Sequence, residues 1–497
     1  MFDTVLVANR GEIAVRIIRA CREMGLASVA VYSDVDRLSP HVLEADKAVQ
    51  IGPAPSSESY LRGDHLIEVA RSEGAGAIHP GYGFLAERSS FAGAVEQAGL
   101  VFIGPSAAAI EAMGDKTEAR RRMAQAGVSI VPGTQQPASG PEEASATAQE
   151  LGFPVLLKAS AGGGGKGMRV VTDADDVSGA FEAASREAES AFGDGSIYVE
   201  KYLTRPRHIE VQVLGDRSGS LVHLGERECS IQRRHQKLIE ESPAPSLPPE
   251  DREAMGLAAL KAAQAVDYHG AGTVEFLYQD GEFYFLEMNT RLQVEHPVTE
   301  FVTGLDLVQW QIRVARGESL DFRQEDLSFS GHSIECRITS EDPDRGFLPA
   351  TGCIGHLEVP TGPGVRWDGG IRAGSEIGLH YDPLLGKLIV HAGSRADAIA
   401  RMKRALGELV IQGVETSVPF HLRVMEEADF REGDFTIAYL KDHPELLQPA
   451  DGEDRLIALA AALLEHRARG NVGASRINEA DGRGLSAWRT SGWPWQT

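Results

Sequence analysis

Residues 287–296 read Glu-Met-Asn-Thr-Arg-Leu-Gln-Val-Glu-His, and this stretch decides how the chain folds around its candidate site. In an extended strand, successive side chains point to opposite faces of the sheet. We therefore expect one face to carry only polar side chains: Glu287, Asn289, Arg291, Gln293 and Glu295. Such a row combines oxygen ligands for a metal ion with a guanidinium fork that binds anions. It indicates a functional site rather than a solvated strand face.

The residues before this stretch predict a β-hairpin around Asp280-Gly281. A two-residue loop would pair Glu275 with Leu286 and turn Glu275 away from Glu287. A three-residue loop, which adds Gln279, would set Glu275 and Glu287 diagonally on the same face. Both loop lengths are permitted for this sequence.

We expect the three-residue loop, because it brings two carboxylates together. Glu275 and Glu287, with Asn289, would then offer the hard oxygen ligands that suit Mg²⁺ and its bridging phosphates. Ordinary surface acids on a hairpin are the alternative interpretation.

The N-terminal part alternates strand and helix patterns, which predicts an α/β fold. Strands are expected at 4–8, 28–32, 77–79 and 101–103, and helices at 66–71, at 91–98 and after Gly11, where Ile13, Ile17, Cys21 and Met24 form an apolar stripe. This alternation predicts a parallel sheet covered on both faces, ending near Gly114. The first turn lacks a G-x-G-x-x-G fingerprint, so a dinucleotide-binding site is unsupported.

A glycine-rich segment, residues 160–168, joins predicted strands at 155–159 and 170–171. Four adjacent glycines lose much backbone entropy on ordering, so a flexible linker is one interpretation. Linkers seldom separate two strands. We therefore favour a mobile flap whose backbone amides close over phosphates.

Two other segments are candidate parts of a pocket. Residues 79–85 directly follow a predicted strand, where ligands gather in open α/β sheets, although a simple tight turn is the alternative. Residues 232–237 read Gln-Arg-Arg-His-Gln-Lys and concentrate positive charge. They lack interleaved aromatic residues, so we expect a local anion site rather than a nucleic-acid patch.

The composition limits the class of protein and partner. The 497 residues are enough for roughly three domains. A hydrophobic content of 42% and a charged content of 24% are typical of soluble globular proteins. The formal net charge of −23 argues against binding to nucleic acid or to an anionic membrane. An anionic substrate must then be captured by a local basic pocket.

The sequence predicts a cytoplasmic location. No stretch approaches ~18 uninterrupted apolar residues, so we expect neither a signal peptide nor a membrane span. The four cysteines are scattered, without the paired spacing of a metal site: Cys21, Cys229, Cys336 and Cys353. Reduced thiols are the simplest interpretation.

Together these motifs closely resemble the biotin carboxylase family of the ATP-grasp superfamily, from Val5 to about Leu447. The matching motifs lie at residues 8–13, 79–85, 113–116, 160–168, 232–237, 287–296 and 335–338. Residues 291–296 point to carboxylases, because other ATP-grasp ligases need no bicarbonate site. The resemblance implies an α/β class (α+β in the ATP-grasp part) with a Rossmann-like N-terminal domain at 1–114, an ATP-grasp domain at 115–330 with a lid at about 131–203, and a C-terminal biotin carboxylase domain at 331–447. An extra tail at 448–497 follows the part that resembles the family.

The resemblance implies ATP- and bicarbonate-dependent carboxylation of the ureido N1 of biotin through carboxyphosphate. It names four catalytic residues: Arg291, Glu295, Lys237 and Arg337. Glu295 would deprotonate bicarbonate, and Arg291 would grip it through its planar fork. Gln293 and the Val294 backbone would complete that pocket, and Arg337 would stabilise the enolate-like ureido oxygen.

Other positions match cofactor-binding positions of the family. Magnesium or manganese would be held by Glu275, Glu287 and Asn289. ATP would be bound by Lys116, Lys158, Gly164, Gly165, Glu200, Lys201, Leu203, His208, Gln232 and His235. Tyr82 and Gly83 match positions that line the biotin site.

The resemblance also implies partner proteins. Biotin-bearing chains attach the cofactor within Ala-Met-Lys-Met, whereas the nearest string here, at 401–404, lies in a predicted amphipathic helix. We therefore expect a separate biotin carboxyl carrier protein and a separate carboxyltransferase subunit, which together with this chain would form an acyl-CoA carboxylase of fatty acid biosynthesis. Charged residues of a family homodimer contact are present: Arg16, Arg19, Glu23 and Arg366. Pro363 stands where an aromatic residue can lie, which weakens that expectation.

The tail departs from the family pattern. Residues 454–466 predict a helix with four apolar positions: Leu456, Leu459, Leu463 and Leu464. Trp488, Trp493 and Trp495 lie in the last ten residues. Apolar surface is unfavourable in water, so we expect the tail to dock on this chain's own core or on a partner subunit.

Two other functions remain open at this point. An ATP-grasp carboxylate–amine ligase, or an enzyme of carbamoyl phosphate synthesis, would need an anion pocket different from residues 291–295. An inactive scaffold subunit would show degenerate charges, and none of the motif charges is missing.

Overall fold

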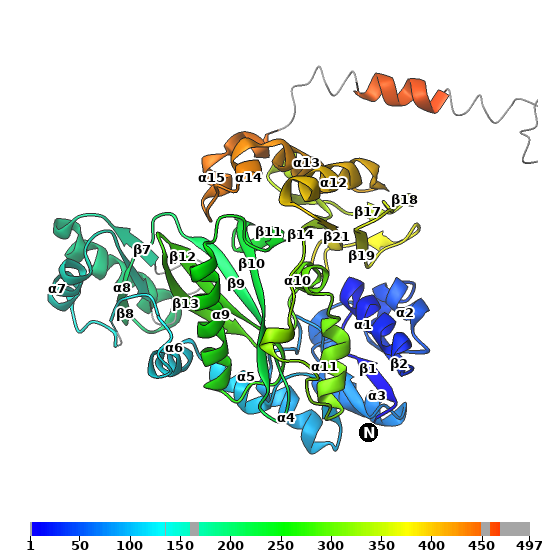
Figure 1. Ribbon diagram of the computed structural model, residues 1–497, viewed down its shortest axis with the longest axis horizontal. Helices are drawn as coiled ribbons and strands as arrows, with labels where there is room; N and C mark the ends of the chain where they lie inside the picture. The colour runs from blue at the N-terminus through cyan, green and yellow to red at the C-terminus, as the bar shows by residue number, and fades with distance from the viewer. Residues whose placement is uncertain (1, 135, 160–167, 449–457, 468–497) are drawn as a thin grey trace, which may run out of the picture. The chain divides into compact units, whose positions relative to one another are not determined.

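The computed structural model describes residues 2–134, 136–159, 168–448 and 458–467 (Figure 1). Contacts divide the chain into a large unit, Met1–Leu447, and a second unit, Gln448–Thr497. Two principal sheets and a smaller one make up the large unit.

The N-terminal sheet has five parallel strands in the order β3-β2-β1-β4-β5. They span Thr4–Val7 (β1), Ala27–Ser33 (β2), Lys47–Gly52 (β3), Ala77–His79 (β4) and Val101–Phe102 (β5). The helices of this part are α1 (Gly11–Glu23), α2 (Pro40–Glu44), α3 (Gly63–Ser72), α4 (Ser89–Gln97) and α5 (Ala107–Gly114). Val5 and Val7 pack with α1, whereas Leu6 packs with α3 and α4. The predicted parallel sheet with both faces covered is confirmed.

The largest sheet has eight strands in the order β13-β12-β9-β10-β11-β14-β21-β19, all antiparallel to their neighbours. Its strands are β9 (Arg207–Gly215), β10 (Leu221–Arg233), β11 (Gln236–Ser242), β12 (Gly270–Gln279), β13 (Glu282–Asn289), β14 (His332–Thr339), β19 (Val365–Gly369) and β21 (Leu384–Ala392). The predicted boundary between the ATP-grasp and C-terminal domains, at residues 330 and 331, falls between β11 and β14. These two strands pair with each other, so both parts of the chain belong to one hydrogen-bonded sheet.

Helices cover both faces of this sheet (Figure 1). They are α9 (Pro249–Gln264), α10 (His296–Thr303), α11 (Leu307–Ala315), α12 (Arg395–Glu408), α13 (Val418–Glu426), α14 (Ala428–Glu432) and α15 (Tyr439–Asp442). On β14, Ile334, Cys336 and Ile338 join the apolar core with α12. Because side chains alternate along a strand, Glu335 and Arg337 face the opposite side, where α10 packs.

Short strand pairs complete the C-terminal part. They are β15 (Glu341–Asp342) with β16 (Leu348–Pro349), β17 (Gly352–Cys353) with β20 (Glu376–Ile377), and β18 (His356–Glu358) with β22 (Val410–Gln412).

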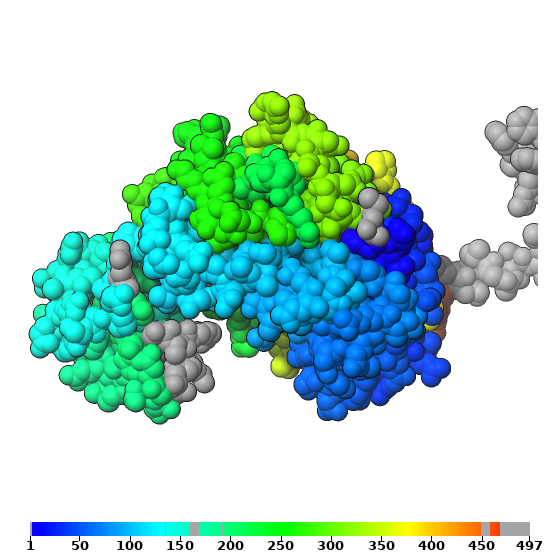
Figure 2. Space-filling view, turned by 90° about the horizontal axis from the view of Figure 1, so that it is seen from below, coloured from blue at the N-terminus to red at the C-terminus, as the bar shows by residue number. Residues whose placement is uncertain are grey.

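A three-stranded antiparallel sheet, β7-β6-β8, lies in the segment predicted to be the lid. It consists of β6 (Val155–Ala159), β7 (Met168–Val171) and β8 (Ile197–Lys201), with helices α7 (Pro141–Leu151) and α8 (Val177–Phe192); α6 (Lys116–Gln125) leads into it. The predicted glycine flap joins β6 to β7, but its residues 160–167, with Gly164 and Gly165, lie outside the described residues. Figure 2 shows a recess between the lid and the N-terminal domain.

The three-residue loop predicted for the β12–β13 hairpin is wrong. Gln279 pairs with Glu282, which leaves a two-residue Asp280-Gly281 turn with φ of 55° and 82°. Such an Asp-Gly turn matches the natural twist of two antiparallel strands. A β-bulge then adds one residue, Leu286, and Glu275 pairs directly with Glu287. The expected pair of carboxylates therefore forms by a different route.

The predicted strand face from Glu287 to Glu295 is also wrong beyond its first residues. β13 ends at Asn289, and residues 290–295 lie outside any strand before α10 begins. Pro297 in the first turn of α10 favours a helix start here. Side chains replace the missing sheet partners, because the Val294 carbonyl accepts a hydrogen bond from Lys387.

The second unit contains one described helix, at residues 458–467, and all of its described side chains are exposed. It overlaps the helix predicted at 454–466 and ends one residue later, at 467. The tail tryptophans lie outside the described residues. In the described part of the chain, no helix has the length and hydropathy needed to cross a membrane. All four cysteines are free thiols, and only Cys353 is exposed.

Candidate active site

Lys237 of β11 lies at the centre of a buried cluster of carboxylates. Its Nζ contacts Glu210, lies 3.0 Å from Glu275 Oε1 and lies 2.7 Å from Glu295 Oε1. Burial would lower the pKa of Lys237, but Glu210, Glu275 and Glu295 outweigh it and raise that pKa well above its usual value. Lys237 is therefore a permanent cation. It links β11 to β9, to β12 and to the loop that carries Glu295.

Glu295 is held between two cations. Its second oxygen accepts a hydrogen bond from Arg337 Nη2 at 2.9 Å. Burial would raise the pKa of Glu295, yet Lys237 and Arg337 hold it well below its usual value. Glu295 is thus an ionised carboxylate at neutral pH, as a general base must be.

Arg337 is oriented by a residue that the sequence did not single out, Glu240. Arg337 Nε and Nη2 lie 2.6 and 2.5 Å from Glu240 Oε1. Burial raises the pKa of Glu240 to about 7, although Arg337 opposes that shift. Directly across the ladder from Glu240 lies Glu335, fully buried, with no hydrogen-bond partner on either oxygen among the residues that the structure describes. Burial raises the pKa of Glu335 well above its usual value, which favours its neutral form.

The three predicted metal ligands come together at the edge of the sheet. Glu275 and Glu287 face each other, and Asn289 Nδ2 donates to Glu275 Oε1 at 2.9 Å. Burial and the charge of Glu275 raise the pKa of Glu287. Lys116 is exposed, with its Nζ 3.7 Å from Glu287 Oε2. Two facing carboxylates and a carboxamide are oxygen donors suited to Mg²⁺, whose charge would relieve their repulsion.

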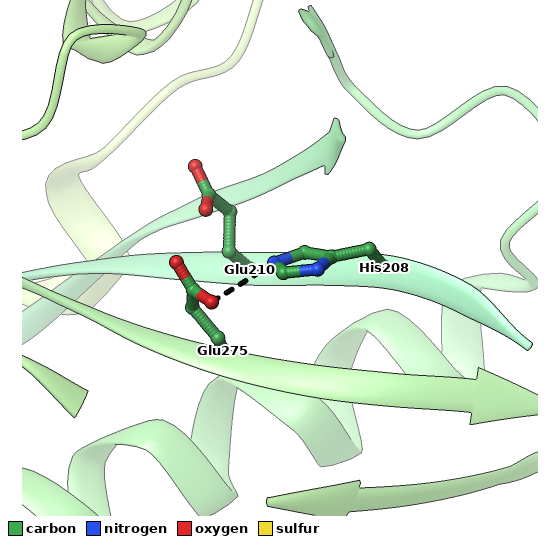
Figure 3. A group of neighbouring side chains, drawn as sticks. All are labelled: His208, Glu210 and Glu275. Carbon is green, nitrogen blue, oxygen red and sulfur yellow. Dashed lines mark ion pairs between the residues drawn. The ribbon is translucent and has the colours of Figure 1, made fainter. Parts of the chain in front are cut away.

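A second group of possible ligand atoms adjoins this pair (Figure 3). Single ligand atoms of His208, Glu210 and Glu275 lie within 4.8 Å of one another. His208 Nε2 lies 3.1 Å from Glu275 Oε2. Glu275 therefore faces His208, Lys237 and the predicted metal ligands at once, and Lys237 and His208 together hold its pKa below its usual value despite burial.

Arg291 lies with its guanidinium held from two sides. Its Nε donates to Glu87 Oε2 at 2.9 Å, and its Nη2 donates to Asn289 Oδ1 at 2.7 Å. Glu87 belongs to the N-terminal part and was not predicted; it follows the pocket-rim segment 79–85 by only two residues. Arg291 thus joins the N-terminal part to the ATP-grasp sheet.

Gln293 is positioned by Arg227, the largest side chain with no exposed surface. Arg227 Nη2 donates to Gln293 Oε1 at 2.6 Å, and its Nε donates to Glu210 Oε1 at 2.5 Å. It also donates to Gln212, Thr273 and Thr299. In the sequence Arg227 lies between Glu226 and Glu228, a charged context that gives no signal of burial, and the motif analysis did not use it.

The predicted nucleotide residues are spread over several elements: Lys116 begins α6, His208 lies on β9, and the other described ones lie in the predicted lid or near the β10–β11 turn. Glu200 accepts from Arg120 at 2.5 Å and lies 3.9 Å from Lys158. Lys201 instead donates to the carbonyls of Leu151 and Gly152, so its side chain serves the lid itself. Leu203 and Gln232 are half-buried, and His235 is exposed with a φ of 67°.

Tyr82 and Gly83 lie in the loop after β4, as predicted for the rim of a pocket. The Tyr82 hydroxyl donates to Glu12, and burial raises the pKa of Tyr82 well above its usual value. Gly83 has a φ of 69°, a conformation that favours glycine.

A small antiparallel sheet followed by a large one that carries Lys237 among buried carboxylates is typical of the class of ATP-grasp ligases. Three parts of the chain match known families. Residues 1–110 match the biotin carboxylase N-terminal domain, residues 115–323 the carbamoyl-phosphate synthase L chain ATP-binding domain, and residues 335–442 the biotin carboxylase C-terminal domain.

Similar proteins cover nearly all of the large unit. The chain is 52% identical to biotin carboxylase 1 of Bacillus subtilis, over 89% of this chain and 99% of that protein. It is 49% identical to the biotin carboxylase of Haemophilus influenzae, over 89% and 98%. A solved dimer of the biotin carboxylase domain of Hydrogenobacter thermophilus 2-oxoglutarate carboxylase, with MgADP, ADP and bicarbonate, is 49% identical, covers 91% of this chain and 100% of that chain, and has a TM-score of 0.83. The chain belongs to the biotin carboxylase family and is an ATP-dependent ligase.

Proposed function

We propose that this chain uses ATP and bicarbonate to carboxylate the ureido N1 of biotin on a separate carrier protein, through carboxyphosphate. The observation that carries this proposal is Glu295, an ionised carboxylate 2.7 Å from Lys237 and 2.9 Å from Arg337. It is the base that deprotonates bicarbonate. The attack of bicarbonate on the γ-phosphate brings anions together, and the neighbouring cations offset their repulsion.

Arg291 grips the bicarbonate in this proposal, with Gln293 and the Val294 backbone completing the pocket. The planar fork of arginine matches a carboxylate-like anion better than a lysine does. The contacts of Arg291 with Glu87 and Asn289 support this role, because they fix the orientation of the guanidinium.

Lys116, Lys158 and Lys237 bind the phosphates, covered by Gly164 and Gly165 of the flap. Glu275, Glu287 and Asn289 would hold Mg²⁺ or Mn²⁺. When bound, the metal ion neutralises charge on the phosphates. The raised pKa of Glu287 supports this assignment, because the burial and charge repulsion that raise it would be balanced by a cation.

The remaining assignments concern the nucleotide base and biotin. The backbone at Glu200, Lys201 and Leu203 binds adenine, while Gln232, His208 and His235 lie nearer the ribose and phosphates. Tyr82 and Gly83 line the biotin site. Arg337 stabilises the negative charge that forms on the ureido oxygen once N1 loses its proton.

We further propose the partners and compartment. The chain works in the cytoplasm with a carboxyltransferase subunit. Biotin reaches it on a biotin carboxyl carrier protein. The chain also pairs as a homodimer, which the dimer of the Hydrogenobacter relative supports. The tail at 448–497 is a docking segment.

We propose an acyl-CoA as the final acceptor of the carboxyl group. A 2-oxo acid is the second candidate, because two relatives, 54% and 49% identical to this chain, are named for pyruvate and 2-oxoglutarate carboxylases. Transfer assays with the assembled complex and each class of acceptor distinguish the two.

Bicarbonate-dependent ATP hydrolysis, measured with and without free biotin, tests the central proposal. We expect ATP turnover to require bicarbonate and to rise when biotin is added. Turnover that is unaffected by biotin would contradict the proposal, and stimulation by an amine would favour the carboxylate–amine ligase. Transfer of radiolabel from bicarbonate to the biotin of the carrier would identify the product.

A further inference from the structure

The loop that carries Glu295 is held by a lysine from the C-terminal part of the chain. Lys387 of β21 has no exposed surface, and its Nζ donates to the Val294 carbonyl at 2.6 Å. Residues 290–295 have no strand pairing of their own. The position of the peptide next to Glu295 therefore depends on a side chain rather than on a sheet ladder.

The charge of Lys387 is balanced by Glu12 from the N-terminal part. Lys387 Nζ lies 3.2 Å from Glu12 Oε1 and 4.0 Å from Asp368 Oδ2. The Glu12 side chain is only 2% exposed. An unpaired charge in such a place would be strongly unfavourable, so the lysine and the glutamate require each other.

Glu12 has a second contact, and it leads to the proposed biotin site. The Tyr82 hydroxyl donates a hydrogen bond to the same oxygen, Glu12 Oε1, that faces Lys387. A short series of contacts thus runs from Tyr82 through Glu12 and Lys387 to the Val294 carbonyl. It joins the N-terminal loop, the C-terminal sheet and the loop that carries the base.

We infer that Lys387 and Glu12 are a positioning pair, which fixes the base Glu295 and links its placement to the wall of the biotin site at Tyr82. The inference rests on the proposed function. A purely stabilising role explains the pair less well, because replacing a buried ion pair by apolar residues is often neutral or stabilising. A positioning role explains the pair better, because a displacement of about 1 Å in a catalytic group can lower a rate by about 10²-fold.

The test compares Lys387→Met with the double variant Lys387→Met/Glu12→Gln, which leaves no buried charge unpaired at Glu12. We expect both to lower kcat for biotin-dependent ATP turnover by about tenfold to a hundredfold, with KM for ATP changed by less than about twofold. If the single variant does not fold, the double variant carries the test. Arg395→Met is the matched control. It breaks a partly buried ion pair with Glu241 at 2.7 Å, and kcat should be unchanged.

A mutant cycle tests the link to the biotin site. The combination of Tyr82→Phe with Lys387→Met should lose less activity than the product of the two single losses, because both act on one series of contacts. Strictly multiplicative losses would overturn the link. A folded double variant with wild-type kcat, or equal losses in kcat and ATP affinity, would overturn the positioning role. Failure of the proposed function is distinguishable, because the wild-type protein itself would then show no response to biotin.

Discussion

The two large sheets of this protein both bury apolar side chains, but they differ in the buried charges that they carry. In the N-terminal sheet, the central strand β1 buries Val5, Leu6 and Val7, and helices pack on both sides of them. In the eight-stranded sheet, Arg227 and Lys387 have no exposed surface at all. Burial of apolar surface is favourable in itself, whereas buried charges are tolerated only in well-formed networks. Apolar burial stabilises both sheets, and the second sheet in addition retains buried charges.

Of the changes predicted here, loss of the base Glu295 should lower enzymatic activity the most. We expect Glu295→Gln to lower biotin-dependent ATP turnover by about 10²–10⁴-fold, because an amide cannot accept the proton of bicarbonate. Steady-state kinetics with free biotin measure this loss. Binding of ATP, followed by titration, should change little. A variant that loses ATP binding and turnover equally would contradict the assignment of Glu295 as the base.

Removal of matched buried side chains separates stability from activity. We expect Leu6→Ala to lower the free energy of unfolding by about 2–5 kcal/mol through the cavity it leaves, with kcat unchanged in the folded protein. Arg227→Met should lower it by about 3–5 kcal/mol, because Glu210 would lose a buried partner. Chemical denaturation measures both changes.

The double variant Arg227→Met/Glu210→Gln sharpens that comparison. Stability should largely recover, because no lone charge remains, but activity should not, because Gln293 loses the donor that holds its side chain. Recovery of both would show that the charged network serves stability alone.

The pH dependence tests how Lys237 controls the base. Burial favours the neutral form of Glu295, and Lys237 and Arg337 overcome it to lower the pKa. Lys237→Met should therefore raise that pKa, and the acid limb of kcat/KM for bicarbonate should move to higher pH. Lys116→Met is the control, because Lys116 is exposed and pairs instead with Glu287. An acid limb that stays in place in Lys237→Met would exclude this electrostatic role.

The smallest expected effect concerns the buried carboxyl of Glu335. Burial raises its pKa in the folded state, so wild-type stability decreases as pH rises from the pKa of the unfolded chain towards that of the folded protein. Glu335→Gln lacks this titration. We expect it to be more stable than wild type at pH 8 by about 1 kcal/mol, with a smaller difference at pH 5. Unfolding curves at the two pH values measure this difference, and a variant less stable at pH 8 would contradict a raised pKa for Glu335 in the folded protein.

The same contrast explains what could be predicted from the sequence. Apolar periodicity is local, so the strands at 77–79 and 155–159 were predicted with their observed bounds. The motif at 287–296 predicted Glu295 and Arg291 as site residues, because a row of such polar residue types is unusual on a strand face. It did not identify Lys387, because an isolated lysine in a strand carries no signal of a carbonyl 93 residues away.

The hairpin error has a related cause. The Asp280-Gly281 pair predicts a two-residue turn from backbone conformation alone, and that turn is what forms. The bulge at Leu286, which restores the facing of Glu275 and Glu287, has no sequence signature. The prediction that Glu275 and Glu287 lie on the same face was therefore correct, but the loop length from which it was derived was wrong.

The ladder between β11 and β14 limits how this protein can be recombined with its relatives. Four residue pairs, from Ile239 with Cys336 to Ser242 with Ser333, cross the point where the chain would be cut between its ATP-grasp and C-terminal parts. In a chimera joined near residue 330, β11 would come from one parent protein and β14 from the other. Glu240 and Glu335, which face each other across this pairing, would then come from different proteins. A segment exchanged between relatives should therefore contain both strands of a hydrogen-bonded pair, even where a domain boundary in the sequence separates them.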